Sequence, residues 1–326
     1  MDNDIKFSQL RGNDLRDLIL DIENIYLEYR KNLDLPLFVS YGVEIEYEGL
    51  SKDKVDNFLD GKYCKWNSVV DGSLHGGGEI ISPIMFDIKD YWEPLKDICC
   101  YLKSKHVDTS HNAGGHIHIG TQTLGKEYDS WINFIAMYMV YEHVLYRFFY
   151  GDKLLGRKYI YRYARPMADT LYSRYSLYKE YDYYKDILVD LVVHFGRNSA
   201  INFGNVDYSR AGDFMLHNTI ELRIPNGSSE EVIWQNNINA ITKMLLASRF
   251  RDIDLDYLEY KLKNKRVSSE YDYCLYNEIC LKNSLEFVDM VFDNSLDKYY
   301  FLRQYFKNFQ SNYEMSSYVM AKRFVK

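Results

Sequence analysis

Acidic side chains recur at intervals of two residues in the segment YGVEIEYE, which covers residues 41–48. Because successive side chains of a strand point to opposite faces, Glu44, Glu46 and Glu48 would share one face of a strand here. Like charges on one face repel one another unless water or a cation lies between them. The segment therefore indicates either a solvated strand edge or part of a cation site.

A second segment, HNAGGHIHIG at residues 111–120, repeats this spacing with imidazoles. His116 and His118 would share one face of a strand, with isoleucines on the other face. The preceding Gly114 and Gly115 allow a tight turn or a close approach of a ligand to the backbone. A single strand histidine is usually structural, but two at this spacing behind a glycine pair favour a functional role.

A third segment, TIELRIPNG at residues 219–227, places Glu221 and Arg223 on one face and aliphatic residues on the other. A neighbouring ion pair on a sheet surface, worth under about 1 kcal/mol, explains this strand taken alone. It does not explain why three segments share the same pattern.

A fourth segment, DGSLHGGGEIISP at residues 71–83, brings Glu79 after three glycines. It matches neither a phosphate-binding P-loop nor a dinucleotide fingerprint. Glu79 is either a further anionic ligand or a carboxylate at a solvated strand edge. His75 is interpreted as a loop residue.

Together these segments predict a sheet with an aliphatic back and an ionisable front. Carboxylates with an occasional imidazole suit Mg²⁺ or Mn²⁺, and several carboxylates facing one cavity suggest two or more ions. Paired ions that bridge phosphates are a common device of phosphoryl transfer. The front would carry Glu44, Glu46, His116, His118, Glu221 and Arg223.

Apolar periodicity predicts the elements that position these residues. Helices are expected at 14–30, 91–105 (with Pro94 in its first turn), 130–150, 184–194 and 230–250, and further helices follow from about residue 255. Strands are expected at 37–48, 80–83, 116–121, 200–203 and 219–225. Because strands and helices interleave without a strict βαβ rhythm, we expect an antiparallel or mixed sheet with helices such as 130–150 behind it.

The bulk composition narrows the class of protein. Of 326 residues, 47% are hydrophobic and 27% charged, which is typical of a folded globular chain. The net charge of −7, without a basic arm, argues against nucleic acid as a partner. Five cysteines without a CxxC pair, a polar N-terminus and no apolar run of about 20 residues favour a soluble, cytoplasmic protein that neither spans a membrane nor carries disulfides.

Five segments in this order resemble the putative amidoligase family, which belongs to the glutamine synthetase-like carboxylate–amine ligases. They are YGVEIEYEG, DGSLHGGGEIISPI, GGHIHIG, RNSAIN and TIELRIPNG. The resemblance implies an α+β fold in which a curved antiparallel sheet forms half a barrel, with helices packed on its outer face. Residues 1–250 would form this glutamine synthetase-like catalytic domain, and residues 251–326 a C-terminal helical extension packed on it.

The resemblance also implies roles for individual residues. The metal ligands would be Glu44, Glu46, Glu79, His116 and Glu221. The catalytic residues would be Arg223, which meets the transferred phosphoryl group, His118 on the substrate side, and Glu46. The nucleotide contacts would be Arg197, Asn202 and Arg223. An aromatic residue is common in the family after the position of Arg197, and this chain has Asn198 there.

The implied reaction is an ATP-dependent and Mg²⁺- or Mn²⁺-dependent ligation of a carboxylate to an amine. ATP phosphorylates the carboxylate, and the amine then displaces phosphate to form an amide or isopeptide bond. The substrates would be small-molecule or peptide carboxylates and amines. Glu48 is either a base for the amine or a residue at the end of a strand.

Two alternatives stay open. A metal-dependent phosphotransferase on the same sheet would share the first half-reaction. A catalytically silent binding scaffold would keep the fold and lose ligands, whereas all the expected ligands are present. The oligomeric state is left open by the sequence.

Overall fold

The computed structural model describes residues 5–109, 112–150, 160–213, 217–264 and 278–306. Its strands are β1 (Tyr41–Tyr47), β2 (Asn67–Val69), β3 (Gly78–Ile81), β4 (Gly115–Gly120), β5 (Ile201–Asn202) and β6 (Thr219–Leu222). Its α-helices are α1 (Gly12–Glu23), α2 (Lys52–Leu59), α3 (Lys89–Ser104), α4 (Tyr128–Tyr150), α5 (Ile160–Tyr163), α6 (Ala168–Tyr178), α7 (Tyr184–His194), α8 (Glu231–Phe250), α9 (Leu255–Lys263), α10 (Glu278–Val291) and α11 (Ser295–Tyr305). Short 3₁₀ helices cover Phe7–Gln9 and Thr121–Thr123.

The six described strands form one open antiparallel sheet in the order β2-β3-β1-β4-β6-β5. The register sets Glu44 opposite His116 and Glu46 opposite Glu79. It also sets His118 opposite Glu221. Because directly opposite residues of an antiparallel pair lie on the same face, the carboxylates and imidazoles of four strands collect on one side of the sheet. The predicted ionisable front is confirmed.

The other face of the sheet is aliphatic and buried. Helices α3 and α8 contribute large aromatic side chains to it. The Tyr41 ring stacks on Trp92 of α3, with the ring centroids 5.3 Å apart. A Cβ on Gly115 would lie 2.4 Å from the ring of Trp234 on α8, so the glycine allows β4 to approach that helix. The buried residues of this face include Val43, Ile45, Ile80, Ile117, Ile119, Ile201, Ile220 and Leu222.

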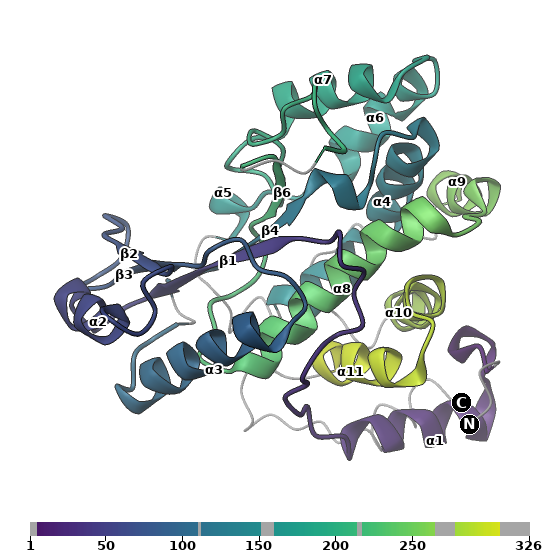
Figure 1. The fold of residues 1–326 in the computed structure, drawn as a ribbon. Helices are drawn as coiled ribbons and strands as arrows, with labels where there is room; N and C mark the ends of the chain where they lie inside the picture. Colours follow the sequence, from purple (N-terminus) through teal and green to yellow (C-terminus); the bar gives the residue numbers. More distant parts are fainter. Residues whose placement is uncertain (1–4, 110–111, 151–159, 214–216, 265–277, 307–326) are drawn as a thin grey trace.

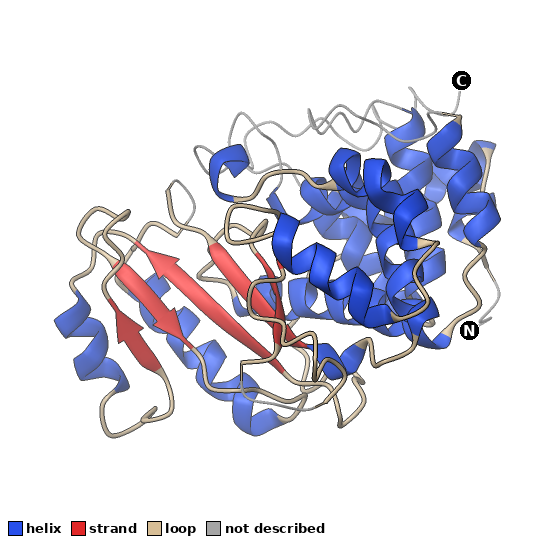
Figure 2. Cartoon of the chain, turned by 90° about the horizontal axis from the view of Figure 1, so that it is seen from above, coloured by secondary structure: helices blue, strands red, loops and turns tan. Residues whose placement is uncertain are grey.

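Most helices gather beside the sheet rather than on it (Figure 2). That 130–150 packs behind the sheet stays a prediction. Helix α4 lies at the centre of the helical part, where it contacts α6, α7, α8, α9, α10 and α11. Most of its described side chains are buried, which is typical of a helix enclosed by other helices. The C-terminal helices α9, α10 and α11 therefore lie against α4 (Figure 1), while the tail at 307–326 lies outside the described residues.

The predicted helix at 14–30 is too long. Helix α1 ends at Glu23, and Tyr26 is 83% exposed. Peptide groups beyond the helix find partners on other elements: Arg303 donates to the Ile25 carbonyl, and the Gln235 side chain accepts from the Arg30 N–H at 2.9 Å. The chain can therefore leave the helix without losing its hydrogen bonds.

Other boundaries differ by a few residues, and some elements were not expected. Helix α3 starts at Lys89, so Pro94 lies in its second turn and not in its first. The strands at 37–48 and 219–225 are shortened to β1 and β6. The sequence interpretation missed the helices α2, α5 and α6 and the strand β2. Among the described helices, none is long and apolar enough to cross a membrane.

Candidate metal centre

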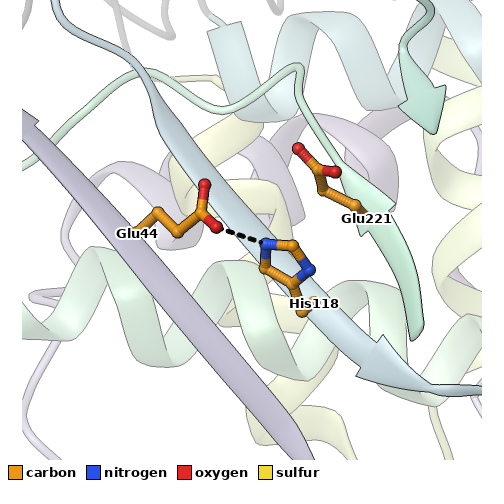
Figure 3. Close-up of side chains that lie close together, drawn as sticks. All are labelled: Glu44, His118 and Glu221. Carbon is orange, nitrogen blue, oxygen red and sulfur yellow. Dashed lines mark hydrogen bonds and ion pairs between the residues drawn. The ribbon is translucent and has the colours of Figure 1, made fainter. Parts of the chain in front are cut away.

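Two groups of ligand-type side chains lie on the ionisable face of the sheet. The first contains Glu44 from β1, His118 from β4 and Glu221 from β6 (Figure 3). The Glu44 Oε1 accepts from His118 Nε2 at 2.9 Å. One possible ligand atom from each of the three residues lies within 4.8 Å of the others.

The second group contains Glu44, Glu79 from β3 and His116 from β4. The Glu44 Oε2 accepts from His116 Nδ1 at 2.7 Å, and Glu79 Oε1 lies 3.8 Å from the same nitrogen. The Glu221 Oε1 also lies 3.8 Å from His116 Nδ1. Glu44 is therefore shared by the two groups, with one oxygen directed to each histidine.

The site concentrates negative charge in a partly buried place. Burial alone would raise the pKa of the Glu44 carboxyl, but the hydrogen bonds and charges of His116 and His118 hold that pKa well below its usual range. Burial together with the neighbouring charges of Glu44 and Glu46 raises the pKa of Glu79 to about 9. Without a cation, a proton on the Glu79 carboxyl reduces the repulsion among the neighbouring carboxylates.

His118 is oriented through both ring nitrogens. Its Nδ1 lies 3.2 Å from the Thr219 hydroxyl, while its Nε2 bonds to Glu44. Burial alone would lower the pKa of His118, but the bond to Glu44 and the charges of Glu44 and Glu221 raise it. A ring held at both nitrogens has a defined orientation toward the centre of the sheet face.

The Glu221 carboxylate is 4% exposed and is held by three neighbours. Asn202 on β5 donates to Oε2 at 2.7 Å, and Asn205 donates to the same oxygen at 3.3 Å. Arg223 donates from Nη1 to Oε1. Asn202 and Arg223, expected to contact nucleotide, therefore both reach the group that contains Glu221.

Glu46 lies on the same face but outside the two groups. Its Oε2 accepts the backbone N–H of Gly114, and its Oε1 lies 3.5 Å from His116 Nε2. Glu46 thus contacts both the His116 ring and the backbone of the glycine turn that precedes it.

Arg197 is the one expected site residue that the structure does not bring to the cluster. It is exposed in the loop between α7 and β5, and none of the hydrogen bonds or ion pairs of the described residues joins it to the carboxylates. Three contributors were missed by the sequence interpretation: Thr219, Asn205 and Gly42. Thr219 shares the period-two spacing of Glu221 and could have been found that way, whereas nothing in the local sequence marks Asn205.

A cavity of about 280 Å³ adjoins the cluster at its His118 end. Gly42 lies directly opposite His118 on the front of the sheet, so the missing side chain leaves space beside that ring. A Cβ on Gly42 would lie 3.3 Å from the Ser82 hydroxyl and 4.0 Å from His118 Cβ. The lining is Ser40, Tyr41, Gly42, Val43, Glu44, Ile81, Ser82, Pro83, Ile84, His118, Asn205, His217 and Thr219.

The donor set of the cluster fits a hard divalent cation. Each group offers two carboxylates and one imidazole, and Mg²⁺ and Mn²⁺ favour oxygen ligands with an occasional nitrogen. A cation would also neutralise the charge that raises the pKa of Glu79. The residues therefore fit two metal positions that share the Glu44 carboxylate.

Comparison with known proteins adds one match. A family model described as a putative amidoligase enzyme matches residues 59–245, more than half of the 326-residue chain. The matched stretch begins after β1, so Glu44 and Glu46 lie outside it, and it contains Glu79, both histidines of β4, Glu221 and Arg223. No curated protein matches the sequence.

Proposed function

This chain belongs to the putative amidoligase family, and from that premise we propose that it is an ATP- and Mg²⁺- or Mn²⁺-dependent ligase that joins a carboxylate to an amine. The family alone indicates a ligase-type enzyme. ATP, the metal and the route of the reaction are our proposal. The small-molecule or peptide substrates and the glutamine synthetase-like half-barrel are also part of the proposal. The open antiparallel sheet with one ionisable face supports the half-barrel.

One observation carries the proposal: two carboxylate–imidazole groups share Glu44 on one face of the sheet. Glu44, Glu79 and His116 would hold one cation, and Glu44, His118 and Glu221 the other. A pair of bound cations supplies charge neutralisation for phosphate oxygens, which is the main requirement of phosphoryl transfer. A structural ion pair would need neither the shared glutamate nor two histidines.

Arg223 would act beside the cations. Its Nη1 already bonds to Glu221, which sets the plane of the guanidinium at the edge of the cluster. A planar guanidinium binds phosphate oxygens in two-point contacts that an ammonium does not reproduce. Arg223 would therefore stabilise the negative charge on the transferred phosphoryl group.

The reaction has two balanced steps. A substrate carboxylate oxygen attacks the γ-phosphorus of ATP, the bond from that phosphorus to the β–γ bridging oxygen breaks, and ADP leaves. The amine nitrogen of the second substrate then attacks the acyl carbon of the acyl phosphate. The bond from this carbon to the phosphate oxygen breaks, inorganic phosphate leaves, and the amine loses a proton to solvent or a nearby base.

We assign the cavity beside Gly42 to the nucleoside part of ATP. Its lining side chains are mostly neutral, and Glu44 is the one carboxylate among them. Aliphatic walls with a few hydroxyl and amide groups suit a flat, uncharged base. The position next to His118 and Glu44 would bring the phosphates of the same molecule to the metal positions.

The test is product analysis with pairs of carboxylates and amines, Mn²⁺ and ATP. Ligation predicts ADP, free phosphate and an amide in equal amounts, all lost in Glu221→Gln. A stable phosphorylated product with no amide would favour a phosphotransferase. ATP that is neither bound nor hydrolysed by the wild-type protein would favour a silent scaffold.

A further inference from the structure

Glu48 is the third glutamate on the ionisable side of β1, and the proposed function uses none of its atoms. It lies just after the end of β1 and is 8% exposed. Its backbone forms two hydrogen bonds with Asp108, which lies in the segment between α3 and β4. The Glu48 N–H donates to the Asp108 carbonyl at 2.8 Å, and the Asp108 N–H donates to the Glu48 carbonyl at 3.2 Å. The backbone of Glu48 is therefore fixed at the end of β1.

Each oxygen of this carboxylate bonds to a different loop. Oε1 accepts the backbone N–H of His75 at 2.7 Å, and Oε2 accepts from the side-chain amide of Asn112 at 3.0 Å. The first loop leads after three glycines into Glu79. The second loop leads through Gly114 and Gly115 into His116. Glu79 and His116 are two of the three members of one metal group.

The loop that carries His75 lies directly on the end of β1. A Cβ on Gly77 would lie 1.8 Å from the Tyr47 carbonyl oxygen and 2.8 Å from Glu48 Cα, so only glycine permits this approach. On the other side, Glu46 accepts the N–H of Gly114. Two successive glutamates on one face of β1 thus hold the loop before His116, and the second of them also holds the loop before Glu79.

We propose that Glu48 is a positioning residue that clamps the two loops and so places Glu79 and His116 for metal binding. It acts through those residues and takes no proton from the amine. The proposal rests on the proposed function for its metal and turnover readouts, but the clamp itself is a property of the fold. The hydrogen bonds that occupy both carboxylate oxygens are what favour a clamp over a base.

The experiment compares wild type with Glu48→Ala, Glu48→Gln and the control Ser73→Ala. A glutamine keeps one oxygen that accepts the His75 N–H. Its NH₂ group can donate to the Asn112 side-chain oxygen once the Asn112 amide has flipped. An alanine removes both bonds. Ser73→Ala removes a hydroxyl contact to Asp71 within the same loop and leaves the clamp intact.

Three readouts are measured on the full chain: backbone hydrogen exchange in a peptide containing His75, Mn²⁺ affinity by titration, and ATP turnover at rising Mn²⁺. We expect Glu48→Ala to exchange at least about 10-fold faster at His75 and to bind Mn²⁺ about 10–100-fold more weakly, as supporting residues of metal ligands do. Excess Mn²⁺ should restore its turnover. Glu48→Gln and Ser73→Ala should stay within a few-fold of wild type in all three.

Loss of turnover in Glu48→Gln at every Mn²⁺ concentration, with normal exchange and Mn²⁺ affinity, would overturn the proposal in favour of a base. Wild-type exchange and Mn²⁺ affinity in Glu48→Ala would reduce Glu48 to a strand-end residue. If wild type binds no Mn²⁺ and turns over no ATP, the proposed function fails, and the exchange at His75 still decides whether the clamp exists.

Discussion

Glu44→Gln should remove most of the metal-dependent stabilisation of this protein, because Glu44 belongs to both ligand groups. A cation at 100 times its dissociation constant adds about 2.7 kcal/mol of stability, so two such sites add about 5.4 kcal/mol. Even residues that only support a ligand cost up to about 100-fold in affinity when replaced. After a loss of affinity of about 100-fold, the same Mn²⁺ concentration equals the new dissociation constant of each site. Each site then adds about 0.4 kcal/mol of stability, or about 0.8 kcal/mol for both.

The assay is thermal unfolding with and without Mn²⁺ for wild type, Glu44→Gln and the control Glu180→Gln, whose side chain is exposed far along the chain from the cluster. With about 2 °C per kcal/mol for a chain of this size, Mn²⁺ should raise the Tm of wild type and control by about 10 °C and that of Glu44→Gln by about 2 °C. An equal rise in Glu44→Gln would refute the shared-ligand arrangement. Absence of any rise in wild type would refute the metal assignment itself.

Three further outcomes are expected. Arg223→Lys should lower ATP turnover at least about 10-fold even at saturating Mn²⁺, since an ammonium does not replace a planar guanidinium; full turnover would make Arg223 a plain partner of Glu221. Gly42→Val should fill the cavity beside His118 and raise the KM for ATP at least about 10-fold, and an unchanged KM would move the nucleotide elsewhere. Burial, assisted by the charge of Lys261, lowers the pKa of His143 to about 3. In the unfolded chain His143 takes up a proton near pH 6.5, whereas in the folded chain it stays neutral. The free energy of unfolding is therefore unaffected by His143 above pH 6.5 and falls below it, by about 2 kcal/mol at pH 5 as measured by urea unfolding. His143→Gln should lack this part of the slope, and an identical slope in both proteins would contradict it.

The ionisable face could be predicted because it depends only on local periodicity. The spacing of two in β1, β4 and β6 specifies which side chains share a face whatever the neighbours are. The hydrophobic alternation of the same strands specifies which face is buried. Glu44, His116, His118 and Glu221 were therefore found without knowledge of the strand order.

The pairing of particular residues was not predictable in this way. Which glutamate reaches which histidine depends on the order β3-β1-β4-β6 and on its register, and both are set by contacts between distant segments. The sequence did not distinguish Glu44, shared by both groups, from Glu46, which bonds to the backbone of Gly114. The resemblance implies that both glutamates are metal ligands, and that assignment stays a prediction.

The helical part shows the same limit. The apolar residues of 130–150 indicated a helix correctly, but a helix that is apolar on most sides fits a bundle centre as well as a sheet back. Its partners are helices that follow it in the chain, from α6 to α11. The separation of residues 1–250 from 251–326 likewise stays a prediction.

The most direct test of the account is the number of Mn²⁺ ions bound per chain, measured by electron paramagnetic resonance in the presence of a non-hydrolysable ATP analogue. Two carboxylate–imidazole groups that share Glu44 predict two ions per chain that are magnetically coupled, and a loss of the coupled signal in Glu44→Gln. A wild-type protein that binds no Mn²⁺ would contradict the claim that this face of the sheet is a metal-dependent catalytic site, and a coupled signal that survives in Glu44→Gln would contradict the sharing of Glu44.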